Sequence, residues 1–185
     1  MKIVIFFMLL FASMQSLEAT TLDTSKKIEK ISKKYLGDPY VWGGNTPETG
    51  MDCSGYTKYV FSKVGISIPR TAYTQSKVGQ TIDMKNLEKG DLLFFLTDKK
   101  RNIPITHVGI YLGNDKFIHA ASSKKGIIIS SLSTGYYSKV FKGAKRVIKD
   151  DWSFKQSFYV ALNEEAIKSS MEVKLTSFGG VNDTF

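Results

Sequence analysis

The sequence predicts an α+β domain in which helices pack on one face of an antiparallel β-sheet. Two helical patterns come first along the chain, and several short runs rich in Val, Ile, Phe and Tyr follow them. Helices that precede a series of antiparallel strands are typical of this fold class. With 185 residues, the chain has room for one domain of ordinary size and little more.

The first helix is expected over residues 25–36, where apolar residues recur at helical spacing and Gly37-Asp38-Pro39 ends the pattern. Residues 40–51 are rich in Gly and turn formers, which predicts a loop. A second helix is expected from Cys53 to Val64, because apolar side chains again share one face and Gly65 follows.

The strands are expected in the second half of the chain, after a segment up to Lys77 that has room for a short helix. Gly113-Asn114-Asp115 separates two of the apolar runs tightly enough for a β-hairpin. The expected strands are residues 92–96, 108–112, 116–120 and 127–131, with a further one at 145–148.

The N-terminus reads as a secretory signal peptide. Lys2 precedes a short apolar run, and small residues lead to Ala19, so we expect cleavage before Thr20. The run is too short to span a membrane, which predicts an exported protein, periplasmic or secreted, without a stable membrane anchor after cleavage. The expected organisation is a signal peptide at 1–19, a catalytic domain at 20–149 and a C-terminal extension of unknown role at 150–185.

The formal net charge is +9 at pH 7. An anionic partner is consistent with this charge, and so is a basic surface with no partner at all. Nucleic acid is not expected, because the lysines are spread along the chain and no base-reading motif is present. For an exported protein, cell-wall polymers and lipid surfaces are the more available anions.

The chain has 1 Cys and 2 His, the side chains best suited to nucleophilic and general-base chemistry near neutral pH. An exported protein normally pairs its cysteines in disulfides. The unpaired Cys53 therefore forms an intermolecular disulfide, is inert in the core, or is a reactive thiol. Cys53 opens a predicted helix, where backbone N–H groups are expected to favour a thiolate. His107 and His119 lie on the two strands of the predicted hairpin, so their side chains can share one face. This layout suits acyl transfer by a cysteine nucleophile with His107 as base and His119 as its orienting group.

Several short motifs, in the same order, resemble the NlpC/P60 peptidases from about residue 25 to about residue 148. The matching segments are Tyr40-Val41-Trp42-Gly43-Gly44, Asp52-Cys53-Ser54-Gly55, Pro69-Arg70-Thr71-Ala72, Gln75, Gly90-Asp91-Leu92, His107-Val108-Gly109-Ile110-Tyr111-Leu112-Gly113 and His119-Ala120. Asp-Cys-Ser-Gly alone is weak, but the set together is highly specific.

The resemblance implies a papain-like fold and hydrolysis of peptidoglycan stem peptides, most often between D-γ-glutamate and the following diamino acid. It implies Cys53, His107 and His119 as catalytic residues. It also places Tyr40, Asp52, Ser54 and Arg70 at the substrate, with Arg70 suited to a substrate carboxylate. No cofactor is expected, and the protein is expected to act as a monomer.

Three alternatives stay open at this point. One Cys and two His are able to ligate zinc, although no carboxylate or Cys-x-x-Cys spacing supports a metal site, and none is expected. The second alternative is an amidase that cuts between muramic acid and the first alanine. The third is a catalytically silent wall-binding protein.

Overall fold

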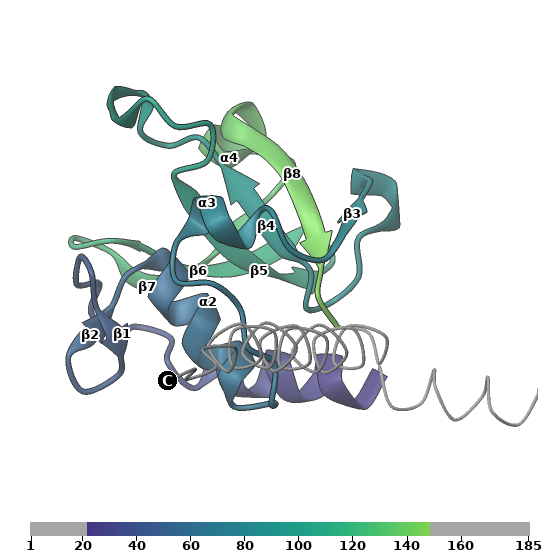
Figure 1. The fold of residues 1–185 in the computed structure, drawn as a ribbon, viewed down its shortest axis with the longest axis horizontal. Coiled ribbons are helices and arrows are strands. Elements are labelled where there is room, and N and C mark those ends of the chain that lie inside the picture. The colour runs from purple at the N-terminus through teal and green to yellow at the C-terminus, as the bar shows by residue number, and fades with distance from the viewer. Residues whose placement is uncertain (1–21, 149–185) are drawn as a thin grey trace, which may run out of the picture. The chain divides into compact units, whose positions relative to one another are not determined.

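The structure is a computed structural model that describes residues 22–148 (Figure 1). The expected signal peptide and C-terminal extension lie outside the described residues. The described residues form an α+β fold, as the sequence predicts.

A six-stranded antiparallel sheet is the centre of the fold, with strand order β3-β8-β4-β5-β6-β7. The strands are β3 (Gln80–Ile82), β4 (Leu92–Phe95), β5 (His107–Gly113), β6 (Lys116–Ser122), β7 (Gly126–Ser131) and β8 (Phe141–Arg146). A small separate hairpin lies within the expected loop. It pairs β1 (Asn45–Thr46) with β2 (Gly50–Met51), and each of these strands is two residues long.

The helices lie before the sheet in the chain, apart from short ones in its connections. Residues 22–33 are helical and are followed by turns. The other helices are α2 (Cys53–Ser62), α3 (Ala72–Gln75) and α4 (Gly135–Val140), with 3₁₀ turns η1 (Met84–Asn86) and η2 (Lys99–Arg101). In Figure 1, α2 runs below the sheet, and the N-terminal helix, drawn in purple, lies lower still. The Tyr56 hydroxyl of α2 donates to the Ser32 carbonyl at 2.9 Å, which ties the two helices together.

The two faces of the sheet are both covered, because residues along a strand alternate between them. Leu92 and Phe94 of β4 belong to the main core, which includes Tyr56 of α2. Leu93 and Phe95 lie on the other face in a smaller cluster with Phe117, and α4 contributes Tyr137 and Val140 there.

The first two helices and strands β4 to β7 agree with the sequence to within a few residues, whereas β3 and β8, at one side of the sheet, do not. The last strand runs from Phe141 to Arg146, whereas residues 145–148 were expected. Only Ala144 is buried in this strand, so it carries no apolar run. Val147 and Ile148, which suggested the strand, are buried just beyond its end. β3 and α4 were not predicted, for the same lack of a clear apolar pattern.

Candidate active site

Cys53 is the first residue of α2 and is almost fully buried, with 7% of its surface exposed. Asp52 caps this helix in an extended conformation, and its carboxylate accepts a hydrogen bond from the Gly55 N–H at 2.7 Å. A cap of this kind satisfies one of the free N–H groups at a helix start. It fixes the backbone at Cys53, where the sequence predicts that a helix begins.

Asp52 is also held by Arg70, which comes from the segment before α3. The guanidinium donates to both carboxylate oxygens, at 2.9 and 2.7 Å. It donates further to the Ser54 hydroxyl at 3.0 Å and to the Gly44 carbonyl at 3.1 Å. Burial raises the pKa of Asp52, but the hydrogen bonds from Arg70 and Gly55 and the charge of Arg70 outweigh it, so the pKa is lowered overall. The pair is therefore ionised at neutral pH.

The glycines of the two motifs bring the loop against the helix start. A Cβ on Gly55 would lie 2.1 Å from the Gly44 carbonyl oxygen, so no side chain fits there. The Gly43 N–H donates to Asp52 at 3.1 Å, and the Asp52 N–H donates to the Gly44 carbonyl at 3.1 Å. The Gly-rich loop is thus part of the wall around Cys53.

His107 and His119 meet across the β5–β6 hairpin, as expected. The pairing of Ile110 with Ile118 makes them diagonal neighbours on one face. Gly109 lies between them on that face, and a Cβ there would be 2.7 Å from Phe117 and 3.1 Å from the His119 Cβ. Its missing side chain gives the His119 strand the space to approach.

A continuous hydrogen-bond chain runs through the two imidazoles. His107 Nε2 lies 2.7 Å from His119 Nδ1, and His119 Nε2 lies 3.0 Å from the Ser130 Oγ on β7. The sequence analysis did not identify Ser130. Its place after three Ile residues gives no chemical signal. The β6–β7 register pairs Ser130 with Phe117 and His119 with Ile128, which makes Ser130 a diagonal neighbour of His119.

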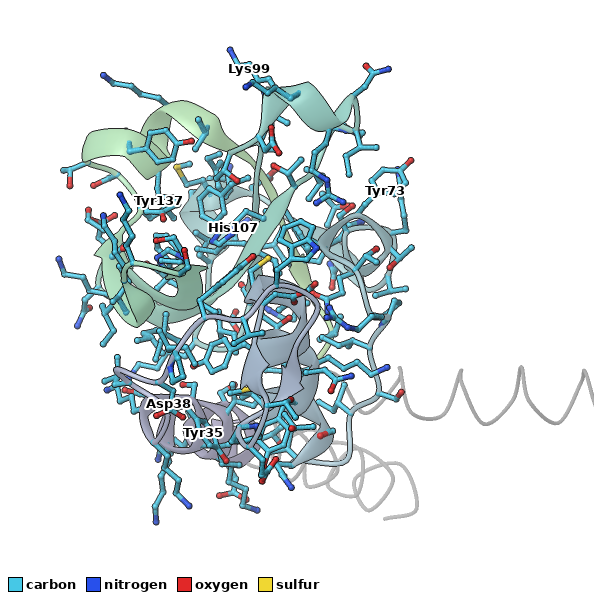
Figure 2. The ribbon with its side chains drawn as sticks, turned by 90° about the vertical axis from the view of Figure 1, so that its left-hand side faces the viewer. Tyr35, Asp38, Tyr73, Lys99, His107 and Tyr137 are labelled. Atoms are coloured by element: carbon cyan, nitrogen blue, oxygen red, sulfur yellow. The ribbon has the colours of Figure 1, made fainter. Side chains whose placement is uncertain are left out.

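Tyr137 of α4 packs on the two imidazoles. Its ring is stacked on His107 with centroids 6.1 Å apart and is edge-on to His119 at 4.8 Å. Figure 2 shows Tyr137 and His107 side by side, far from Tyr35 and Asp38 at the other end of the domain. Burial, followed by the charges of Tyr136 and Cys53, raises the pKa of Tyr137 to about 12, so its phenol is neutral. Sequence reasoning missed this residue because α4 was not predicted.

Burial keeps the reactive groups neutral. It lowers the pKa of His107 to about 4, and it lowers that of His119 to about 2 with help from His107. Burial and then the charge of Asp52 raise the pKa of the Cys53 thiol to about 11. Hydrogen bonds from the backbone N–H groups of Val108, Ser54 and Cys53 itself lower the pKa, but by less. The expectation that the helix start favours a thiolate is therefore wrong for the resting protein. The hydrogen bond from the Val108 N–H also means that the thiol lies beside Val108, the strand residue that follows His107.

A cleft of about 470 Å³ opens at the Cys53 thiol. All four residues expected to bind substrate line it: Tyr40, Asp52, Ser54 and Arg70. Its other lining residues are Trp42, Cys53, Thr71, Ala72, Tyr73, Arg101, Ile103, Ile105 and Thr106. Burial, then the charges of Cys53 and Asp52, raise the pKa of Tyr40 to about 12, so its neutral hydroxyl faces the cleft near the thiol.

Residues 22–148 contain no group of three or more His, Cys, Asp or Glu side chains arranged to hold a metal ion. Within the same residues, no helix is both long and apolar enough to cross a membrane.

The sequence model of the NlpC/P60 family matches residues 37–146, which is more than half of the chain. The chain belongs to the NlpC/P60 family. The match includes the helix start at Cys53, both histidines and Arg70.

Two curated relatives illustrate the range of the NlpC/P60 family. The chain is 43% identical over 117 residues to the bifunctional muramidase/DL-endopeptidase CwlT of Bacillus subtilis, covering 63% of this chain and 35% of that protein. It is 39% identical over 140 residues to the murein DD-endopeptidase MepH of Escherichia coli, covering 70% of this chain and 51% of that protein. The chain thus spans about a third to a half of the length of these relatives.

The fold is also that of solved NlpC/P60 structures. A Staphylococcus aureus protein of the NLP/P60 family, described as similar to lipoprotein, superimposes with a TM-score of 0.63 at 40% identity. The superposition covers 69% of this chain and 42% of that one. The predicted papain-like NlpC/P60 fold is confirmed.

Proposed function

We propose that the protein is a peptidoglycan hydrolase that cleaves an amide bond in the stem peptide, with Cys53 as nucleophile. The observation that carries the proposal is the hydrogen-bond chain from His107 through His119 to Ser130, together with a buried thiol at a helix start that the N–H of Val108, the residue after His107, contacts. The names of the relatives as DL- and DD-endopeptidases support this substrate class. Such a substrate lies outside the cytoplasmic membrane, in agreement with the expected signal peptide.

From this chain of hydrogen bonds we propose a role for each nitrogen. His107 uses Nε2 toward His119, so its Nδ1 is the nitrogen left to accept the Cys53 proton. Nε2 of His107 then carries the proton and donates to Nδ1 of His119, and Nε2 of His119 donates to the Ser130 hydroxyl. His119 orients the ring of His107 and fixes its tautomer.

The reaction begins from a neutral pair, because the thiol pKa is high and the imidazole pKa is low. His107 takes the thiol proton as the sulfur attacks the amide carbon, and the C–N bond breaks as His107 returns the proton to the leaving amine. Water, deprotonated by His107, then cleaves the thioester and releases the acid and the free thiol. The N–H of Cys53 at the helix start is placed to stabilise the oxyanion.

The scissile bond that we propose is the one between D-γ-glutamate and the diamino acid, as in the relative named a DL-endopeptidase. Purified muropeptides would be digested with the wild type and with Cys53→Ala, and the products identified by mass spectrometry. A new free amine on the diamino acid is the expected result. Cleavage of the cross-link, as the name of the E. coli relative suggests, or release of peptides that begin at L-alanine would reassign the bond. No cleavage at all would support the silent wall-binding alternative.

A further inference from the structure

Two arginines line the cleft beside Cys53, and the structure separates their roles. Arg70 was expected to bind a substrate carboxylate, but it donates to Asp52 through both terminal nitrogens and is only 32% exposed. Its charge is balanced within the protein. A carboxylate that approached Arg70 would have to compete with Asp52, which is fixed by three further hydrogen bonds.

Arg101 has no such partner. Within residues 22–148 it forms no ion pair and no hydrogen bond, and its side chain is exposed at the cleft wall. Its guanidinium carbon lies 5.1 Å from the centre of the Trp42 ring. Stacking on an aromatic ring holds a guanidinium in position and leaves its N–H groups free to donate.

The backbone turn that carries Arg101 also defines its position. It is the last residue of η2, which begins at Asp98, where the carboxylate accepts from the Lys100 N–H at 3.0 Å. Asn102 follows in the left-handed conformation and ends the turn. Arg101, Tyr40 and Cys53 line the same cleft, and the charge of Arg101 lowers the pKa of Tyr40 against its overall rise.

We propose that Arg101 is a specificity residue that binds a carboxylate of the substrate, held ready by Trp42. The inference rests on the proposed function, because a γ-linked D-glutamate presents its α-carboxylate a short distance from the bond that is cut. The free fork of N–H groups on a guanidinium matches a carboxylate in charge and in shape. Lys99 and Lys100 are not among the residues that line the cleft, so they add only a general positive potential.

The test compares two soluble peptides that differ in one group. One is L-Ala-γ-D-Glu-diaminopimelate, and the other carries a neutral amide in place of the glutamate α-carboxylate. Values of kcat/KM would be measured for the wild type, for Arg101→Gln, and for Lys100→Gln, the matched loss of one charge on the same turn. A third peptide with lysine in place of diaminopimelate tests the second source of a carboxylate.

The wild type is expected to prefer the acid over the amide by roughly tenfold, the value of one charge-assisted hydrogen bond in a partly exposed site. Arg101→Gln should remove that preference by slowing cleavage of the acid alone, and Lys100→Gln should keep it. Arg101→Lys should restore part of it. If the preference instead separates diaminopimelate from lysine, Arg101 still binds a carboxylate, but that of the diamino acid.

Two results would overturn the assignment while leaving the proposed function intact. One is equal cleavage of all three peptides by the wild type. The other is an Arg101→Gln variant that slows all three by the same factor, which would show a general effect on the cleft. Failure of the wild type to cut any of the peptides would overturn the assignment and the choice of the γ-D-glutamyl bond, and digestion of muropeptides would then decide whether the hydrolase function stands.

Discussion

His107 Nε2 and His119 Nδ1 lie 2.7 Å apart, with both rings buried between the sheet and Tyr137. Two neutral imidazoles at this distance share one proton, which must sit on a defined nitrogen because each ring has one donor and one acceptor. The acceptor left over on His107 is the one that the thiol needs. If His107 is the base, as proposed, His119 acts through it, and the effects of changing the two should differ in kind.

We expect His107→Ala to lower kcat by a factor of about 10² to 10⁴, the usual value of general-base catalysis. His119→Gln keeps an acceptor for the His107 proton and should retain more activity than His119→Ala. The measurement is turnover on purified muropeptides, with folding checked by circular dichroism. The role given to His119 is wrong if His119→Gln is as inactive as His107→Ala, or if His119→Ala is fully active.

Cys53→Ala should abolish hydrolysis and leave the fold unchanged, because it removes the proposed nucleophile and only a small buried volume. Cys53→Ser should be nearly inactive as well, since His107 has to deprotonate a hydroxyl that is a much weaker acid. Mass spectrometry of digested muropeptides would detect residual turnover. Wild-type rates in either variant would rule out Cys53 as the nucleophile.

Ser130→Ala should lower kcat by a small factor, on the order of 2 to 10, with little change in KM. The variant removes the acceptor of the His119 Nε2–H, but Ser130 is only partly buried, so water can take its place. Ser130→Thr keeps the hydroxyl and should restore the rate. Ser133→Ala, an exposed change in the following loop, is the control. An effect on KM alone would indicate that Ser130 contacts substrate and does not orient His119.

The side chains that we propose as catalytic could be selected from the sequence, and the residues that contact them could not. Cys53 and the two histidines stand out because their chemistry is rare in the chain and their spacing fits a helix start and a hairpin. Ser130 and Tyr137 have no such signal, since a Ser in a strand and a Tyr in a short helix are ordinary. Only the register of β7 and the path of α4 bring them to the histidines.

The electrostatics of the site also depend on burial that no motif reports. A helix start favours an anion, and on that ground the sequence predicted a thiolate at Cys53. In the fold, the thiol is almost fully enclosed and lies beside the charged Asp52, and both effects raise its pKa. The helical regions and central strands were predictable because their apolar patterns are strong, and such patterns can be recognised without tertiary information.

Asp52→Asn should destabilise the protein and lower its activity together. It leaves the partly buried Arg70 without a counter-ion and weakens the cap of α2. Because Arg70 is about one-third exposed, we expect a loss of roughly 1–3 kcal/mol in the free energy of unfolding, below the value for a fully buried pair. Urea denaturation would measure it.

The matched control is Asp23→Asn, which breaks a surface pair with Lys27 in which both side chains are more than half exposed. Its cost should be below about 0.5 kcal/mol. Equal losses in the two variants would show that the Asp52–Arg70 pair does not stabilise the helix start.

Stability should fall as the pH is lowered from about 6.5 toward 4, and His107 should contribute to the fall. Burial lowers the pKa of His107 from its ordinary value of 6.5 to about 4. Between these values the unfolded chain binds the proton and the folded protein does not, so the free energy of unfolding decreases as the pH decreases. His119, whose pKa is lowered to about 2, acts in the same direction. Urea denaturation of the wild type and of His107→Asn at pH 7.5, 6 and 5 would measure the effect. The variant should lose less stability over this range than the wild type, and identical pH dependence in the two proteins would show that His107 is not held neutral by burial.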